Sequence, residues 1–320
     1  RSHGGEIHFN TKLLDFQLDN GTINRISVEK NDSKEEWPVE QVILATGHSA
    51  RDIYQLLNSK HVLLEAKPFA IGVRAEHPQE LIDSIQYHCK NKSEVEHLRE
   101  FLPAASYSLV HQVKERGVYS FCMCPGGIIA PCATQQEEVV TNGWSPSKRN
   151  NPYANSGIVL GLELKDFKPY ERFGALAGLE FQKELEHKAW FYGGKTQSAP
   201  AQRLNDFVNG KKSGSLPDCS YQPGVTSVDM QEVLGKLVGP ALKEGFKAFG
   251  NKMRGYLSNE ALILGVESRT STPVRIPRDK DSLQHPQIKN LFPCGEGAGY
   301  AGGIMSAAMD GERCADKLKQ

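Results

Sequence analysis

The C-terminal stretch of glycines and small side chains limits the possible folds of this chain more than any other segment. Residues 291–318 read LFPCGEGAGYAGGIMSAAMDGERCADKL, which predicts a strand, a glycine-rich loop and a helix in that order. Free N–H groups at the N-terminus of such a helix favour a partial negative charge on a ligand. Small or apolar residues at helical spacing predict a helix face that presses closely on a sheet: Ile304, Ala307, Ala308, Gly311, Ala315 and Leu318.

The glycines of this loop formally match a dinucleotide-binding fingerprint, with Gly297, Gly299 and Gly302 in G-x-G-x-x-G spacing. That motif also needs a second strand and an acidic residue about 20 positions further on. Only 18 residues follow Gly302, so they cannot build the ribose-binding half of an NAD site. The glycines are therefore predicted to contact another ligand, and the alternative is a tight turn without a ligand.

The overall charge argues against nucleic acid as a partner. The 320 residues include 38 basic and 38 acidic side chains, for a formal net charge of zero, so no overall field attracts a polyanion. Apolar runs such as residues 42–45 are far shorter than the roughly 20 residues of a membrane-spanning helix. We therefore expect no nucleic acid and no membrane as a partner, and the oligomeric state stays open.

The seven cysteines are spread over residues 89–314 and contain no C-x-x-C pair. Free thiols in a reducing compartment fit this distribution, which predicts a cytoplasmic protein. Cys122 and Cys124, with Cys132 nearby, come nearest to a metal motif, but one intervening residue is a poor zinc spacing. No metal site is predicted.

The N-terminal part predicts a small β unit. Residues 1–4 resemble the basic last turn of a helix closed by a glycine, which indicates that the given chain begins inside a domain. Strands are expected at residues 6–9, 12–18 and 22–29, with a hairpin turn at Asn20-Gly21. An apolar run at 39–45 predicts a buried strand, and Ser49 is the expected N-cap of the helix that follows.

The middle of the chain predicts a mixed α+β domain. Strands are expected near residues 69–74, 106–113, 118–123, 139–141 and 157–164, and helices at 79–87, 175–190 and 230–249. The last of these helices is expected to break at Gly239-Pro240, because proline cannot donate an interior helical hydrogen bond.

Six blocks of sequence together resemble one protein family. They are ATGHSARD (45–52), KPFAIGVRAEHPQELID (67–83), MCPGGIIAPCAT (123–134), NGWSPSKRNNPYANSGIV (142–159), GVESRTSTPVRIPRD (265–279) and PCGEGAGYAGGIMSAAMDGE (293–312). On these blocks the chain resembles the uncharacterised FAD-dependent (FAD-utilising) dehydrogenases, a family related to glutathione-reductase-type flavoproteins. Because the blocks span nearly the whole chain, the resemblance is far more specific than the glycine spacing alone.

The resemblance implies a fold of the α/β class, namely a partial FAD/NAD(P)-binding, Rossmann-like domain interrupted by a large inserted mixed α+β domain. The FAD-binding remnants are expected at residues 1–66 and 280–320, and the inserted substrate or cap domain at 67–279. The family also implies an upstream βαβ unit for the ADP pyrophosphate, which residues 1–10 do not supply. The chain thus resembles the C-terminal part of a longer protein. This part alone is expected to be inactive and to bind FAD weakly or not at all.

The resemblance also implies positions that contact the cofactor, FAD. Glu296 resembles the acid of a Gly-Asp or Gly-Glu pair that hydrogen-bonds a ribityl or phosphate-side hydroxyl. The cofactor-binding residues implied in this way are Gly295, Glu296, Gly297, Gly299, Tyr300, Ala301, Gly302 and Gly303, together with Ala45, Thr46 and Gly47. The implied function is transfer of hydride or electrons through flavin by an oxidoreductase (dehydrogenase) that acts on a small-molecule substrate of unknown identity. The alternative is a non-catalytic flavoprotein fold that serves as a binding or structural module.

No catalytic residue is assigned, but three kinds of side chain are candidates. Cys124, Arg269 and Arg275 are candidate substrate contacts. Cys124 or Cys294 could act as a redox thiol, and Arg269 and Arg275 could hold a substrate carboxylate. His48 and His111 are possible proton donors. Each has a structural alternative: an inert buried thiol, an ion pair with Asp279 or Glu267, or a histidine satisfied within the fold.

Overall fold

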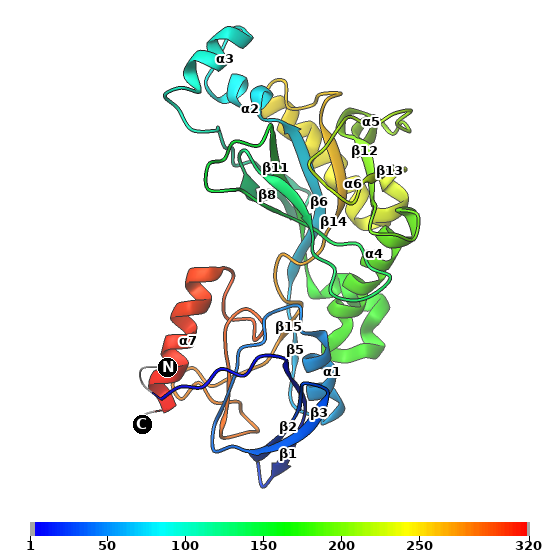
Figure 1. Cartoon of the computed structure of the whole chain (residues 1–320). Helices are drawn as coiled ribbons and strands as arrows, with labels where there is room; N and C mark the ends of the chain where they lie inside the picture. Colours follow the sequence, from blue (N-terminus) through cyan, green and yellow to red (C-terminus); the bar gives the residue numbers. More distant parts are fainter. Residues whose placement is uncertain (1–3, 319–320) are drawn as a thin grey trace. The chain divides into compact units, whose positions relative to one another are not determined.

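The computed structural model describes residues 4–318, which form two compact units (Figure 1). Unit 1 comprises Arg1–Lys67, Phe173–Leu176 and Ser271–Gln320, and unit 2 comprises Pro68–Arg172 and Ala177–Thr270. The helical turn predicted at residues 1–4 lies, up to residue 3, outside the described residues. Residues 271–279, which the sequence assigned to the insertion, group with unit 1 because β15 (Val274–Arg275) pairs with β5 (Glu65–Ala66).

Unit 1 begins with a three-stranded antiparallel sheet. Its strands β1 (Thr11–Asp19), β2 (Thr22–Lys30) and β3 (Ser33–Pro38) pair in sequence order. The predicted hairpin turn is confirmed, and Asn20 and Gly21 both have the positive φ (48° and 75°) that a type I′ turn requires. The strand expected at residues 6–9 is wrong, because this segment has no pairing partner in the sheet and ends at Asn10, whose φ is 50°.

A pair of short parallel strands, β4 (Val42–Leu44) and β16 (Leu291–Pro293), forms the second layer of unit 1. Helix α1 (Arg51–Ser59) follows β4 and buries Ile53, Tyr54 and Leu57. Ser49 is not the N-cap of this helix, because α1 starts one residue later than expected, after Ala50, which has no side-chain acceptor.

The predicted C-terminal helix is confirmed as α7 (Ile304–Leu318), but the face it buries differs from the predicted one. Asp310 and Cys314 are buried, whereas Ile304, Met305 and Met309 are 90%, 73% and 60% exposed. Within residues 4–318, two short parallel strands give the helix only a narrow surface to pack on. Much of the apolar face expected from the spacing is therefore exposed in this chain.

Unit 2 is built on a seven-stranded, mostly antiparallel sheet in the order β13-β12-β14-β6-β11-β8-β7, so the chain is a mixed α/β protein (Figure 1). The strands are β6 (Phe69–Pro78), β7 (Val110–Val113), β8 (Arg116–Cys124), β11 (Tyr153–Leu162), β12 (Ala199–Arg203), β13 (Val225–Ser227) and β14 (Leu262–Glu267). A separate two-stranded ribbon pairs β9 (Ile128–Pro131) with β10 (Thr141–Trp144). The strand expected at residues 139–141 thus overlaps β10 only at Thr141. Central β6 buries nine of its ten residues, and buried polar groups on such a strand need partners.

Helices complete the hydrophobic core of unit 2. They are α2 (Gln79–Gln86), α4 (Ala177–Tyr192), α5 (Leu204–Asn209) and α6 (Met230–Lys252). A further helix, α3 (Lys92–Leu98), packs on α2, and a 3-10 stretch spans Leu164–Leu176, of which Phe173–Leu176 group with unit 1. The break predicted in α6 at Gly239-Pro240 is wrong, since the non-helical residue is Gly235 (φ 70°, ψ −170°). Pro240 lies shortly after this break. Proline has no N–H, so Pro240 cannot donate the helical hydrogen bond to the carbonyl of Lys236, which is the first residue of the helical segment after Gly235.

No helix within residues 4–318 combines the length and the apolar character that crossing a bilayer requires. All seven cysteines are free thiols, of which Cys122 is exposed and Cys124, Cys294 and Cys314 are buried.

Candidate functional site

The parallel strands of unit 1 bring the two segments expected to contact FAD to one place. Leu44 of β4 lies opposite Pro293 of β16, and the N–H of Cys294 donates to the Leu44 carbonyl over 3.0 Å. Residues 45–47 and 295–303 therefore leave the strands at the same edge. In open α/β sheets, ligands bind outside the carboxyl ends of parallel strands.

The glycines of the loop differ in what surrounds them. One is packed closely against another backbone segment, and others face open space. A Cβ on Gly297 would lie 2.5 Å from the carbonyl oxygen of Gly47, so no other residue fits there without movement. Gly299 has a φ of 85°, which disfavours any side chain. By contrast, Gly302 and Gly303 have no heavy atom within 4 Å of a Cβ position. This part of the loop leaves room for a ligand to reach the backbone.

Polar side chains hold the two segments together. Nδ1 of His48 lies 3.2 Å from Oε2 of Glu296, and both side chains are about three-quarters buried (23% and 27% exposed). The hydroxyl of Tyr54, on α1, donates to the Gly297 carbonyl over 2.8 Å and lies 2.9 Å from Oγ1 of Thr272. Burial raises the pKa of Tyr54 to about 12, so this phenol stays protonated and anchors the loop.

A buried ion pair holds the start of the glycine loop. The guanidinium of Arg278 donates to both oxygens of Asp310, over 2.6 and 2.9 Å, and Asp310 also accepts the Gly295 N–H over 2.8 Å. The same guanidinium lies 3.9 Å from the centre of the Tyr300 ring. Burial alone would raise the pKa of Asp310, but the hydrogen bonds from Arg278 and Gly295 lower it below its ordinary value. Asp310 thus ties α7 to the loop.

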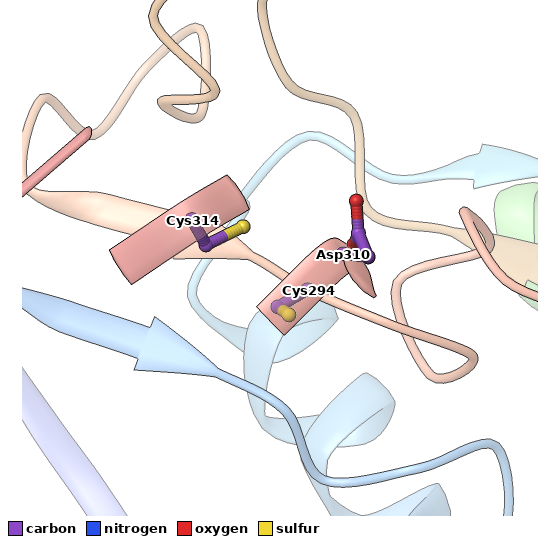
Figure 2. A group of neighbouring side chains, drawn as sticks. All are labelled: Cys294, Asp310 and Cys314. Carbon is purple, nitrogen blue, oxygen red and sulfur yellow. The ribbon is translucent and has the colours of Figure 1, made fainter. Parts of the chain in front are cut away.

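Figure 2 shows Asp310 near two thiols, Cys314 on α7 and Cys294 just after β16. One ligand atom of each of the three side chains lies within 4.8 Å of those of the other two. Such a trio could in principle hold a metal. However, Arg278 also donates to Sγ of Cys314 over 3.4 Å, so a cation would meet a guanidinium in contact with two of the three ligands. Burial raises the pKa of Cys294 to about 12. This thiol is therefore neutral, and we interpret the trio as packing between α7 and β16.

Two buried arginines form hydrogen bonds that connect several of the sequence blocks in unit 2. Arg74 on β6 donates to both oxygens of Glu267 over 2.8 and 2.9 Å and to the side-chain oxygens of Asn142 and Asn155. Arg269 was a candidate substrate clamp, but its three nitrogens donate to Thr134, Glu138 and Glu186. The structure therefore supports an internal ion-pair role for Arg269, with partners that the sequence did not indicate.

The thiols near Arg74 differ in their environments. Cys124, the candidate substrate contact, is 4% exposed, and its Sγ donates to the Cys122 carbonyl over 3.3 Å. Hydrogen bonding from Cys124 and the charge of Arg74 lower the pKa of Cys122, while the pKa of Cys124 is raised. The exposed Cys122 is thus the more reactive of the two thiols, which the sequence did not distinguish. His111, the other candidate proton donor, lies on β7 in unit 2.

A buried carboxylate on β6 makes the stability of the protein depend on pH. Burial raises the pKa of Glu76 to about 7, although the hydroxyl and N–H of Ser220 both donate to it. Between its ordinary pKa of 4.5 and about 7, folded Glu76 keeps a proton that the unfolded chain releases. The free energy of unfolding is therefore expected to fall by about 2–3 kcal/mol from this group as pH rises through that window.

Urea denaturation at pH 5 and pH 8 would measure this effect in the wild type and in Glu76→Gln, which cannot titrate. We expect the wild type to lose more stability than the variant between the two values. Equal losses would show that Glu76 does not hold its proton in the folded state.

Comparison with known proteins identifies the class of protein. Residues 68–270 match the family model described as FAD-dependent protein, C-terminal domain-like. The chain belongs to this family of FAD-dependent proteins. The matched residues coincide with the outer limits of unit 2. A relative from Clostridium beijerinckii, named only as an uncharacterized protein, is 41% identical over 319 residues. The alignment covers 98% of this chain and 57% of that relative.

In this member of the family the structure brings the expected loop residues together within unit 1, and the other candidates divide between the two units. Arg275 lies in unit 1 with the glycine loop, whereas Cys124 and Arg269 lie in unit 2. Sequence reasoning missed Tyr54, Arg278 and Asp310, which hold the loop. One signal was available for Asp310, because this charged residue directly follows the small and apolar run Ala307-Ala308-Met309.

Proposed function

We propose that this chain supplies the isoalloxazine-facing half of an FAD site in a longer FAD-dependent oxidoreductase. The parallel pairing of β4 with β16 carries the proposal, because it places residues 45–47 and the glycine loop at one strand edge, next to the N-terminus of α7. The family match adds that FAD is the cofactor to consider.

The residues of this edge fit a flavin. The backbone at Gly302 and Gly303 is open to a ligand, and Nε of Arg275, buried beside the loop, has no hydrogen-bond partner among residues 4–318. Flavin, when bound, accepts and passes on hydride or electrons. The loop N–H groups and the α7 N-terminus would stabilise negative charge on the flavin pyrimidine edge, and Glu296, oriented by His48, would accept a hydrogen bond from a ribityl hydroxyl.

The proposed fold of the complete site is Rossmann-like and interrupted by unit 2, with its remaining strands supplied by polypeptide outside this chain. Two observations support this view. Within residues 4–318 the parallel sheet of β4 and β16 is two strands wide, and α7 exposes Ile304 and Met305. In addition, the chain spans 57% of the length of the curated relative it matches.

The test compares Gly302→Ala with Gly311→Ala in the full-length product of the gene. Neither substitution meets a heavy atom of another segment, so both variants should fold. A methyl group at Gly302 would lie where the flavin is proposed to approach, and we expect FAD affinity to fall at least about tenfold, or about 1.4 kcal/mol. Gly311→Ala, on α7, should keep wild-type affinity. A colourless, well-folded wild type would contradict FAD binding.

Reduction separates an oxidoreductase from a non-catalytic flavoprotein fold. We expect NADH or NADPH under anaerobic conditions to bleach the visible absorbance of bound flavin. Persistent absorbance with both donors, in a protein that binds FAD tightly, would favour a binding or structural module.

A further inference from the structure

Two cations of unit 1 lie side by side next to the glycine loop, without an acidic partner among the residues that the structure describes. Lys67 directly follows β5, and Arg275 belongs to β15, the strand that pairs with β5. The N–H of Lys67 donates to the Pro273 carbonyl over 2.9 Å, so both backbones are held by the same ladder. Within residues 4–318, neither side chain forms an ion pair, although Glu65 lies directly opposite Arg275 in the ladder.

Both side chains pack on the glycine loop itself. A Cβ on Gly299 would lie 3.3 Å from Cδ of Lys67 and 3.5 Å from Cβ of Arg275. The N–H of Ile276, the next residue after Arg275, donates to the Ala298 carbonyl over 3.2 Å. The backbone of both cationic residues is therefore held by the β5–β15 ladder and, through Ile276, by the glycine loop.

This arrangement is electrostatically unfavourable as it stands. Burial and the charge of Arg275 lower the pKa of Lys67. Nε of Arg275 is buried without a hydrogen-bond partner among the described residues, and a buried donor left unpaired costs free energy. The guanidinium lies 5.7 Å from the centre of the Tyr300 ring, a contact that replaces neither the missing acceptor nor the missing countercharge.

We propose that Lys67 and Arg275 form a binding site for an oxyanion, a phosphate or carboxylate group of a ligand that reaches the glycine loop. An oxyanion would separate the two like charges, accept the free Nε–H of Arg275 and gain a planar, charge-assisted contact from its guanidinium. The site does not require flavin, because the oxyanion can belong either to the cofactor or to a separate substrate.

The first experiment uses the whole chain with inorganic phosphate or acetate as the probe, and compares wild type, Lys67→Met, Arg275→Met and Lys289→Met. Lys289 is an exposed lysine of unit 1 and is the matched control. Without added oxyanion, Lys67→Met should raise Tm by about 2 °C, since it removes the repulsion, and Lys289→Met should not. Phosphate or acetate should raise the Tm of wild type and Lys289→Met, and at least tenfold more of either anion should be needed in Lys67→Met and Arg275→Met.

A second measurement needs no variant. Brief acetylation with acetic anhydride, followed by mass spectrometry, reports the accessibility of each lysine in the wild type. Phosphate should slow the acetylation of Lys67 and leave that of Lys289 unchanged. The proposal is wrong if neither phosphate nor acetate protects Lys67, or if the four proteins respond equally to both anions.

Adding FAD in the same acetylation experiment, carried out on the full-length product of the gene, distinguishes the two sources of the oxyanion. If FAD displaces phosphate from Lys67 and riboflavin does not, the site holds a phosphate of the cofactor. If phosphate still protects Lys67 when FAD is bound, the site holds a separate ligand. Because the phosphate and acetate arms involve no flavin, failure of the oxyanion site and failure of FAD binding are seen in different measurements.

Discussion

Replacing Glu267 by alanine is expected to lower the free energy of unfolding by about 3–5 kcal/mol. The side chains of Arg74 and Glu267 are 0% and 3% exposed, and the variant leaves the Arg74 guanidinium in the centre of the sheet without a countercharge. The remaining oxygen acceptors are neutral: the side chains of Asn142 and Asn155 and the backbone carbonyl of Cys122. Urea denaturation monitored by circular dichroism measures the loss.

An exposed ion pair in the same unit provides the control for this prediction. Lys188 and Glu184 on α4 are 43% and 46% exposed and pair at i, i+4 spacing. Lys188→Ala should therefore cost less than about 1 kcal/mol. If Glu267→Ala costs no more than Lys188→Ala, the buried pair does not have the role in stability that its burial implies.

Asp310→Asn is expected to destabilise the protein by about 3 kcal/mol, because Arg278 then lies buried beside a neutral amide. The side chains of this pair are 4% and 5% exposed. Asparagine keeps the shape of the carboxylate and an acceptor for the Gly295 N–H. The variant therefore tests the charge of Asp310, apart from its size.

The pH dependence of this effect follows from the lowered pKa of Asp310. A carboxyl whose pKa is lower in the folded state contributes its stability above its unfolded pKa, and loses it as pH falls toward the folded value. The difference between wild type and Asp310→Asn should thus be constant near neutral pH and shrink below about pH 4. A difference that persists unchanged in acid would show that the ion pair is not its cause.

Local patterns predicted those elements whose cause is local. The Asn20-Gly21 hairpin depends on residues that tolerate positive φ, and the helix at α7 depends on helical spacing, so both could be read without knowledge of the fold. Errors arose where the causes are not local. The break in α6 lies at Gly235 instead of Gly239-Pro240, because proline is tolerated close to a helix start, and where that start lies depends on packing.

The candidate site was predictable in its residues but not in its supports. Glycines at Gly297 and Gly299 stand out in the sequence, and the family resemblance connected them with residues 45–47. The sequence did not show that Gly297 touches Gly47, that Tyr54 anchors the loop from α1, or that Asp310 reaches Gly295. These partners are separated along the chain and meet through strand pairing and helix packing.

For the arginines, residue type and neighbours in sequence were not enough to assign a role. Arg269 and Arg275 lie six positions apart in one sequence block and looked equivalent as ligands for a carboxylate. In the structure Arg269 is enclosed by Glu138 and Glu186, while Arg275 stands next to Lys67 with a donor left free. Glycine content, charge balance and helical spacing are properties of the amino-acid sequence and could be determined from it. Which charges meet depends on contacts between distant segments, and electrostatic interaction falls steeply with separation and exposure, so only the folded chain distinguishes a paired arginine from an available one.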